Sequence, residues 1–255
     1  APPGDDDSAP EEPAPPLGFD AACAAEPAEP SAGWRGPLSD AHVHGDFLSP
    51  EEQEPFFSSL LREMNAQGVE RVVISGPPPW NLPGGLEALR ALETGWEDLA
   101  RRCPRLLFQV AGFDPDDAAA ADYVAARLEE APFAGVGSVD LHHPFGDHDP
   151  LAAGMPAVYD LLEARGLPFQ FHGLTSHDPG GDFPARMLEV IAARPGLQFV
   201  WFGCPGSLPG RPANLTCVLP TDAVAGLVET GADLALDGAV VGVDTAPQGY
   251  NPPRA

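Results

Sequence analysis

From residue 38 onward, short apolar runs alternate with longer segments in which apolar positions recur every three or four residues. The short runs predict β-strands, and the amphipathic segments predict α-helices. Strands are expected at eight places, namely residues 40–47, 69–75, 105–113, 133–141, 167–173, 197–203, 213–220 and 238–244. Helices are expected at residues 49–68, 84–103, 114–131, 155–166, 183–196 and 221–231. This alternation predicts an α/β fold.

Local signals mark where some of these helices begin and end. Ser49 followed by Pro50 predicts an N-cap and a first helical position, and Gly68 predicts the end of the same helix. Asp114 and Pro115 predict a second helix start of the same kind.

Eight strands that alternate with helices favour a (β/α)8 TIM-like barrel, and a doubly wound open sheet is the alternative. No G-x-G-x-x-G motif follows the first strand, which speaks against the alternative. Residues 37–255 form the predicted barrel domain, which is compact beside the roughly 250 residues typical of this fold. Only "TAPQGYNPPRA" follows Asp244. The barrel is therefore expected to lack a final helix, and the N-terminal tail or a neighbouring subunit could cover the gap.

The first 36 residues differ from the rest of the chain. "APPGDDDSAPEEPAPP" and the sequence after it are rich in Pro, Ala and acidic residues and lack periodic apolar positions. Such a segment buries too little apolar surface to offset the conformational entropy lost on ordering. Residues 1–36 are therefore expected to form a flexible acidic tail, with a partner-docking arm as the less favoured alternative.

The charge balance limits the partners. A net charge of −25 speaks against the basic patches that nucleic acid and anionic membranes require. We therefore expect a small-molecule substrate, and a homo-oligomer is compatible with the sequence. The chain has 13 arginines and no lysine, which rules out a lysine Schiff base, a P-loop lysine and a carboxylated-lysine metal bridge.

No apolar run reaches the roughly 18 to 20 residues needed to span a bilayer, and the N-terminus lacks the regions of a signal peptide. The protein is expected to be soluble, and it could be an exported chain whose signal peptide has been removed, so the compartment stays open. Cys23, Cys103, Cys204 and Cys217 match no zinc-knuckle spacing. Their pairing does not follow from the sequence. A Cys204–Cys217 disulfide is one option, because the strands at 197–203 and 213–220 would be adjacent.

Polar residues with metal-binding chemistry stand at the ends of several predicted strands. In "LSDAHVHGDF", His42 and His44 are two positions apart and therefore point to the same face of the strand. His172 ends the apolar stretch "LPFQFH", and Asp244 ends the last strand. In barrels of this class the carboxyl ends of the strands form the active site. Neutral imidazoles with one carboxylate suit Zn²⁺ or a similar divalent ion.

Each of these features has a plainer explanation when it is taken alone. The H-x-H pair is also found at ordinary polar strand ends. His172 alone is typical of a hydrogen-bonded core histidine, and Asp244 alone is typical of a turn. Their order and their common place at strand ends favour a metal site.

The same residues resemble those of the amidohydrolase superfamily, nearest to its branch of metal-dependent hydrolases and decarboxylases. The segments that carry the resemblance are "DAHVHG", "GSVDLHHPFGDHDPLAAGMPAVYDLLEARGLPFQFHG" and "VVGVDTAP". The resemblance implies that His42, His44 and His172 hold one divalent ion, Zn²⁺ with Mn²⁺ or Fe²⁺ as alternatives. It also implies that Asp244 lies against this ion and acts as the general base.

One position departs from the family pattern. The sixth strand usually ends in a histidine that polarises the substrate carbonyl, whereas this chain has Gly203 and Cys204 there. A structural thiol is the favoured explanation for Cys204. His142, at the end of the fourth strand, and His177, in "LTSHDPGGD", are candidate catalytic replacements. A solvated loop histidine is the favoured explanation for each.

The sequence predicts a metal-dependent hydrolase of a small ester, lactone or amide. A metal-activated water would attack the carbonyl, and Asp244 would take the proton of that water. Two alternatives stay open: a non-oxidative decarboxylase on the same metal site, and a non-catalytic metal-binding or interaction barrel. Substrate, metal identity and oligomeric state do not follow from the sequence.

Overall fold

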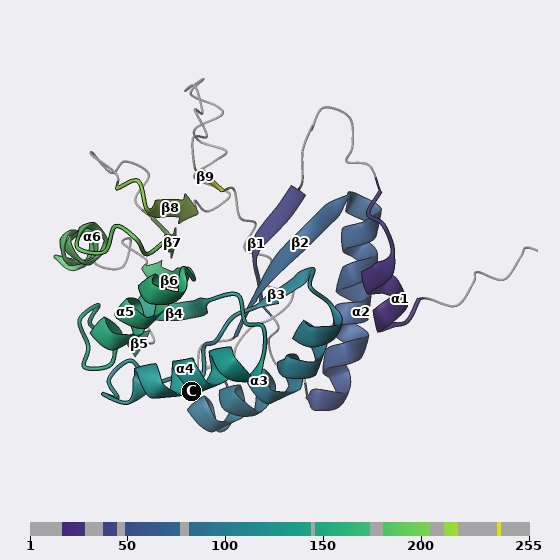
Figure 1. The fold of residues 1–255 in the computed structure, drawn as a ribbon, viewed down its shortest axis with the longest axis horizontal. Helices are drawn as coiled ribbons and strands as arrows, with labels where there is room; N and C mark the ends of the chain where they lie inside the picture. The colour runs from purple at the N-terminus through teal and green to yellow at the C-terminus, as the bar shows by residue number, and fades with distance from the viewer. Residues whose placement is uncertain are drawn as a thin grey trace, which may run out of the picture.

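The computed structural model describes residues 17–28, 38–44, 49–76, 82–143, 146–173, 181–204, 212–218 and 239–240. Its strands form two sheets (Figure 1). The first contains, in spatial order, Leu38–His44 (β1), Val69–Ser75 (β2) and Leu106–Phe108 (β3). The second contains, in spatial order, Gly146–Asp147 (β5), Val136–His143 (β4), Phe169–Gly173 (β6), Phe199–Phe202 (β7), Leu215–Val218 (β8) and Ala239–Val240 (β9).

The two sheets continue into one another. A parallel bridge between Val110 and Val136 connects the chain just after β3 to the start of β4. All strand pairs are parallel except β4 with the short hairpin strand β5. Apart from β5, the spatial order follows the chain order, as it does in a barrel. Among the described residues no ladder joins β9 to β1, so the structure shows a parallel α/β fold and not the closed barrel expected from the sequence.

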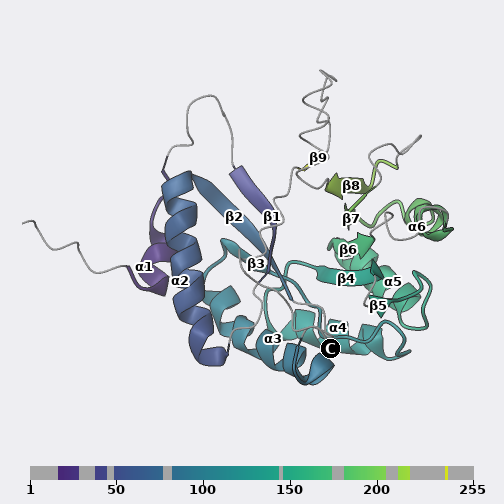
Figure 2. The same ribbon diagram turned by 180° about the vertical axis from the view of Figure 1, so that it is seen from behind.

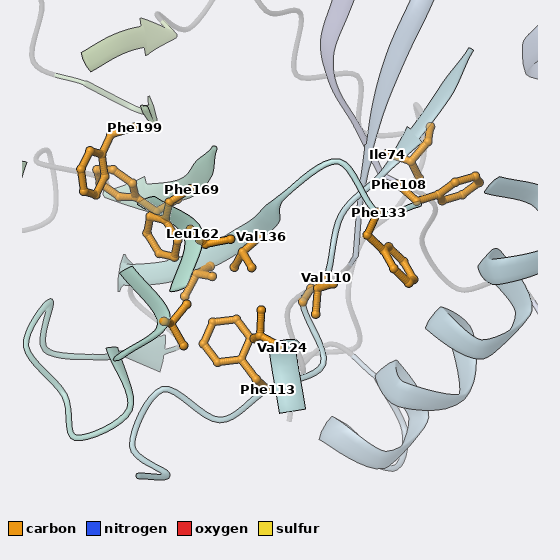
Figure 3. Packing of buried hydrophobic residues seen from close by; sticks show 14 of the residues in the cluster. Ile74, Phe108, Val110, Phe113, Val124, Phe133, Val136, Leu162, Phe169 and Phe199 are labelled. Atoms are coloured by element: carbon orange, nitrogen blue, oxygen red, sulfur yellow. The ribbon is translucent and has the colours of Figure 1, made fainter. Parts of the chain in front are cut away.

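Helices cover one face of this combined sheet (Figures 1 and 2). They are Pro50–Gln67 (α2), Gly85–Arg102 (α3), Ala120–Glu130 (α4), Met155–Arg165 (α5) and Phe183–Ala192 (α6). Trp96 of α3 contacts Phe108 of β3 with ring centroids 5.3 Å apart, and Tyr159 of α5 contacts Phe169 of β6 at 5.0 Å. Figure 3 shows Val110, Phe113, Val124 and Val136 between Phe108 and Phe169. None of the described helices is both long and apolar enough to cross a membrane.

The expected boundaries of the helix at residues 49–68 are confirmed. The backbone N–H of Ser49 donates to the carboxylate of Glu52 at 2.9 Å, which satisfies a free donor at the start of α2. Gly68 follows the last turn with a φ of 74°, a left-handed conformation that favours glycine.

The expected helix start at Asp114 and Pro115 is wrong, because α4 begins at Ala120. The carboxylate of Asp114 accepts from the N–H of Asp116, and that of Asp117 accepts from the N–H of Ala119, both at 2.9 Å. Such local bonds hold the backbone in turns and compete with the helix. The helix expected at residues 221–231 lies outside the described residues.

The prediction of a flexible tail does not hold for residues 17–28. Phe19–Ala24 forms a short helix, α1, in which Phe19 and Ala22 are buried. A disulfide joins Cys23 to Cys103, and the guanidinium of Arg102 lies 4.7 Å from the centre of the phenylalanine ring. A helix this short is unstable alone, so these contacts with distant residues hold it in place. The domain boundary at residue 36 stays a prediction.

Candidate functional site

β6 shows how one strand divides its residues between two faces. Phe169 and Phe171 are fully buried, and the ring of Phe169 contacts Tyr159 of the helix layer. Because side chains alternate along a strand, Gln170 and His172 face away from the helices. We call this side the inner face, since it corresponds to the interior of a barrel.

His172 belongs to a row of residues that are in register across the second sheet. Its partner on β4 is Asp140 and its partner on β7 is Phe202, and the row continues through Val218 and Val240. The rings of His172 and Phe202 stack with centroids 5.1 Å apart. An imidazole and a buried carboxylate thus stand at the same level on adjacent strands, and both are donor types that bind Zn²⁺ and similar cations.

The strand with the H-x-H pair lies in the first sheet. His44 is in register with Ser75 at the end of β2, so β1 and β2 end at the same edge. The register is irregular between Asp40 and Val43, the stretch that contains His42. The side chains of His42 and His44 lie outside what the structure describes, and their role as ligands stays a prediction.

Other predicted site residues also lie outside the described part of the chain. Asp244 and His177 do so entirely, and His142 does so for its side chain. The backbone of His142 is in register with Gly173, and the pairing of β4 with β6 shifts by one residue between Asp140 and His142. Among the described side chains no group of three or more His, Cys, Asp or Glu could hold a metal ion. His172 is thus the predicted ligand whose side chain can be placed.

A contact on the helix side holds the end of β6. The indole N–H of Trp201 donates to the carbonyl of Gly173 at 3.0 Å. A Cβ at Gly173 would lie 2.5 Å from the ring of Phe183 and 2.8 Å from the indole nitrogen. Glycine therefore lets both rings close over the backbone directly after His172.

Cys204 and Cys217 form a disulfide with a Cα–Cα distance of 5.4 Å, which confirms the pairing considered from the sequence. Cys217 is in register with Trp201, a fully buried residue of the helix side. The disulfide joins the residue that follows Gly203, after β7, to β8. The sulfur of Cys204 is therefore not free to bind metal or to act as a nucleophile.

Sequence reasoning missed a buried, uncharged group on the inner face, which we call the inner polar layer: Ser75, Gln109 and Gln170. These side chains are 0%, 3% and 1% exposed. The hydroxyl of Ser75 donates to Oε1 of Gln109 at 3.0 Å. A signal was present in "VVIS", "LLFQ" and "FQFH", where a polar residue takes an inward position of an apolar strand.

A second buried polar cluster lies on the helix side and acts on the backbone. The carboxylate of Glu93 accepts from the N–H groups of Ala111 and Gly112 at 2.5 and 2.6 Å, and from the hydroxyl of Tyr123 at 2.6 Å. Burial raises the pKa of Glu93 in spite of these donors. Burial and the neighbouring Glu93 carboxylate also raise the pKa of Tyr123. The cluster fixes the chain that directly follows Gln109.

Residues 89–201 match the sequence model of the amidohydrolase family. The predicted amidohydrolase resemblance is confirmed. The fold is also similar to that in a crystal structure of 2,6-dihydroxybenzoate decarboxylase complexed with 2,6-dihydroxybenzoate, with a TM-score of 0.52 and 14% sequence identity. The alignment covers 82% of this chain and 89% of that one. No curated protein matches the chain.

The amidohydrolase match includes the in-register pair Asp140 and His172 and most of the inner polar layer. Gln109, Asp140, Gln170 and His172 all lie within residues 89–201. These residues offer one imidazole, one carboxylate and two amides along neighbouring parallel strands, with His172 near the carboxyl end of β6. Such an arrangement can bind a cation, orient a polar substrate and exchange a proton.

Proposed function

We propose that the chain is a metal-dependent enzyme of the amidohydrolase type that removes CO2 from a small carboxylic acid without oxidation. The observation that carries the proposal is that Asp140 of β4 is in register with His172, near the carboxyl end of β6. The similarity of the fold to that of 2,6-dihydroxybenzoate decarboxylase supports the choice of reaction.

The proposal includes closure of the strands into a (β/α)8 barrel. The parallel strands already follow one another in chain order from β1 to β9, apart from β5. In a closed barrel the carboxyl ends of all strands meet at one mouth. His42, His44, His172 and Asp244 would then share that mouth, although they come from three strands far apart in the sequence.

The donor set fits one Zn²⁺, with Mn²⁺ or Fe²⁺ as alternatives. His42, His44 and His172 would supply imidazole nitrogens, and Asp244 would supply a carboxylate oxygen. In the structure the fit rests on His172, which stands at the strand end beside the buried Asp140. When bound, such an ion polarises a substrate oxygen and lowers the pKa of a bound water.

Decarboxylation makes simple demands on the residues around the substrate. The bond to the carboxylate carbon breaks, CO2 leaves, and the electron pair that stays on the substrate carbon takes up one proton. Protonated Asp244 is the proposed source of this proton. Phe202, stacked on His172, offers an aromatic ring at the same level, which suits a flat substrate. The planar acid 2,6-dihydroxybenzoate is therefore the first compound to test.

Hydrolysis of a small ester, lactone or amide is the second candidate. In that reaction Asp244 would take a proton from water, and His142 or His177 would stabilise the tetrahedral intermediate. The match of residues 89–201 to the amidohydrolase family favours it. A non-catalytic barrel would bind the ion and turn over neither kind of compound.

The experiment combines metal analysis with two turnover assays on protein purified without chelator. CO2 release from 2,6-dihydroxybenzoate is followed beside the hydrolysis of a panel of small esters and lactones. The variants are His172→Ala and Asp244→Asn. The matched control is His148→Ala, because the imidazole of His148 contacts Asp116, an exposed residue of the β3–α4 connection, at 3.2 Å.

We expect about one divalent ion per chain in the parent, the usual stoichiometry of a single catalytic site. His172→Ala should lose both the ion and CO2 release. Asp244→Asn should release CO2 at least about 100-fold more slowly, as expected for loss of a proton donor, and His148→Ala should match the parent. Ester turnover without CO2 release would favour the hydrolase. A parent that holds no metal after loading with Zn²⁺ would refute the proposal.

A further inference from the structure

We infer that the inner polar layer positions the side chains that hold the metal, so that metal affinity depends on Ser75, Gln109 and Gln170. These three residues would not bind the ion themselves. The inference rests on the proposed metal site, but not on which reaction that site catalyses.

The layer reaches from β2 to β6, and its residues Gln109 and Gln170 both lie next to Gly137 of β4. Ser75 at the end of β2 donates to Gln109, which directly follows β3, at 3.0 Å. On β4, a Cβ at Gly137 would lie 2.8 Å from Oε1 of Gln109 and 2.6 Å from Cβ of Gln170 on β6. The missing side chain at Gly137 therefore lets the two glutamines approach each other across β4.

Each end of the layer lies beside a predicted ligand. Ser75 is in register with His44 across the pairing of β1 with β2. Gln170 precedes His172 by two residues, so both lie on the inner face of β6. A displacement of the layer would therefore reach ligand positions on both sheets.

Stability alone gives no reason for these residue types. Barrel interiors are filled mainly by bulky branched aliphatic side chains, and a buried polar atom without a partner costs about 1–3 kcal/mol. Ser138, next to Gly137, is 7% exposed, and its hydroxyl has no hydrogen-bond partner among the described residues. Polar atoms have thus been placed on this part of β4 at a cost in stability.

Amides are well suited to hold metal ligands. The amide oxygen can accept from the free N–H of a ligating imidazole, and the amide nitrogen can donate to a ligating carboxylate. An amide does either without adding charge to the site. Partners of this kind fix the orientation of the ligands and typically change metal affinity by about 10–100-fold.

The test uses Co²⁺ as the probe, in the whole 255-residue chain freed of metal. Affinity is measured by competition with a chelator, and the visible absorption bands of Co²⁺ report the coordination geometry. Gln109→Met keeps the length of the side chain and removes the amide. The control is Gln198→Met, the same change at an exposed amide that donates to Phe199 and Thr216 at the opposite end of β7 and β8.

We expect Gln109→Met to weaken Co²⁺ binding by about 10–100-fold and to shift the absorption bands. Gln198→Met should leave both unchanged. Ser75→Ala should shift the bands in the same direction with a smaller loss of affinity, and Ser75→Thr, which keeps the hydroxyl, should restore parental values. This second pair decides the outcome if Gln109→Met does not fold.

Parental affinity and spectrum in folded Gln109→Met and Ser75→Ala proteins would overturn the inference. A parent that binds no Co²⁺ would overturn both the inference and the proposed metal site. A parent that binds Co²⁺ and depends on Gln109, but turns over no acid or ester, would leave the inference standing and remove the proposed function.

Discussion

The helix-facing and inner sides of β6 differ in what surrounds their residues. Phe169 and Phe171 face the helices and contact the rings of Tyr159 and Trp201 in a buried aromatic group. Gln170 and the partly exposed His172 lie on the other side. Within five residues one strand therefore serves two purposes. The helix side supplies the free energy of burial, and the inner side presents polar groups at a strand end, so substitutions on the two faces should have separable effects.

The largest expected difference is in stability. Phe171→Ala removes a fully buried ring and should lower the free energy of unfolding by about 3–5 kcal/mol. His172→Ala, at a partly exposed position, should lower it by less than about 1 kcal/mol while it removes metal binding. Urea unfolding of the metal-free proteins measures both values. If both variants lost a similar amount of unfolding free energy, the separation of a stabilising face from a metal-binding face would be contradicted.

Two glycines test the faces more sharply, because each change adds the same methyl group. Gly173→Ala would press on Phe183 and Trp201 on the helix side, whereas Gly137→Ala would press on Gln109 and Gln170. Gly173→Ala should cost about 1–3 kcal/mol, the usual cost of overpacking. Gly137→Ala should cost more, because the φ of 157° at Gly137 is a backbone conformation that residues with a side chain rarely adopt. Only Gly137→Ala is expected to weaken Co²⁺ binding at a protein concentration where both variants are folded. Gly18→Ala is the control, since a Cβ there meets nothing within 4 Å.

The buried carboxyl of Glu93 should give the helix side a dependence on pH. Burial raises the pKa of Glu93 in the folded protein above its unfolded value of about 4.3. Its contribution to stability is therefore full below about pH 4.3 and falls as the pH rises through the folded pKa. Glu93→Gln should remove this fall. Urea unfolding between acid and neutral pH measures this dependence of stability on pH, with Glu63→Gln at an exposed position as the control. If the stability of Glu93→Gln depended on pH as it does in the parent, the assignment of the effect to Glu93 would be contradicted.

A surface ion pair outside both faces should have the smallest effect. Arg186 donates to both carboxylate oxygens of Asp149 at 2.6 Å, and this bond lowers the pKa of Asp149. The stability gained is present above the unfolded pKa of about 3.9 and is lost as the pH falls through the folded value. Because the side chain of Asp149 is 45% exposed, Asp149→Asn should cost less than about 1 kcal/mol at neutral pH. The difference between parent and variant in thermal unfolding should shrink in acid.

Much of the fold could be predicted because local patterns carry it. The alternation in "LPFQFH" assigns Phe169 and Phe171 to one face and His172 to the other before any contact is known. The helix from Pro50 to Gln67 begins and ends at signals within its own sequence. In both cases the determining interactions lie within a few residues along the chain.

The site was predictable only in outline. A histidine at the end of an apolar strand identifies His172, but its partners depend on register. Asp140 lies beside it because β4 and β6 pair with a particular offset, and that offset changes by one residue before His142. Register is set by the summed packing of whole strands, which a motif does not contain.

By itself, the sequence predicted most of the described strands and helices, the apolar face of β6, and the positions of the candidate ligands. Only the tertiary structure decided that α1 packs on the domain through Cys103, that α4 starts at Ala120, and that Ser75 and Gln109 form a pair 34 residues apart in the chain. The physical reason is the distance along the chain over which each kind of interaction acts. Periodicity and capping act over a few residues, whereas a disulfide, a strand register and a buried hydrogen bond join residues that become neighbours only when the whole chain has folded.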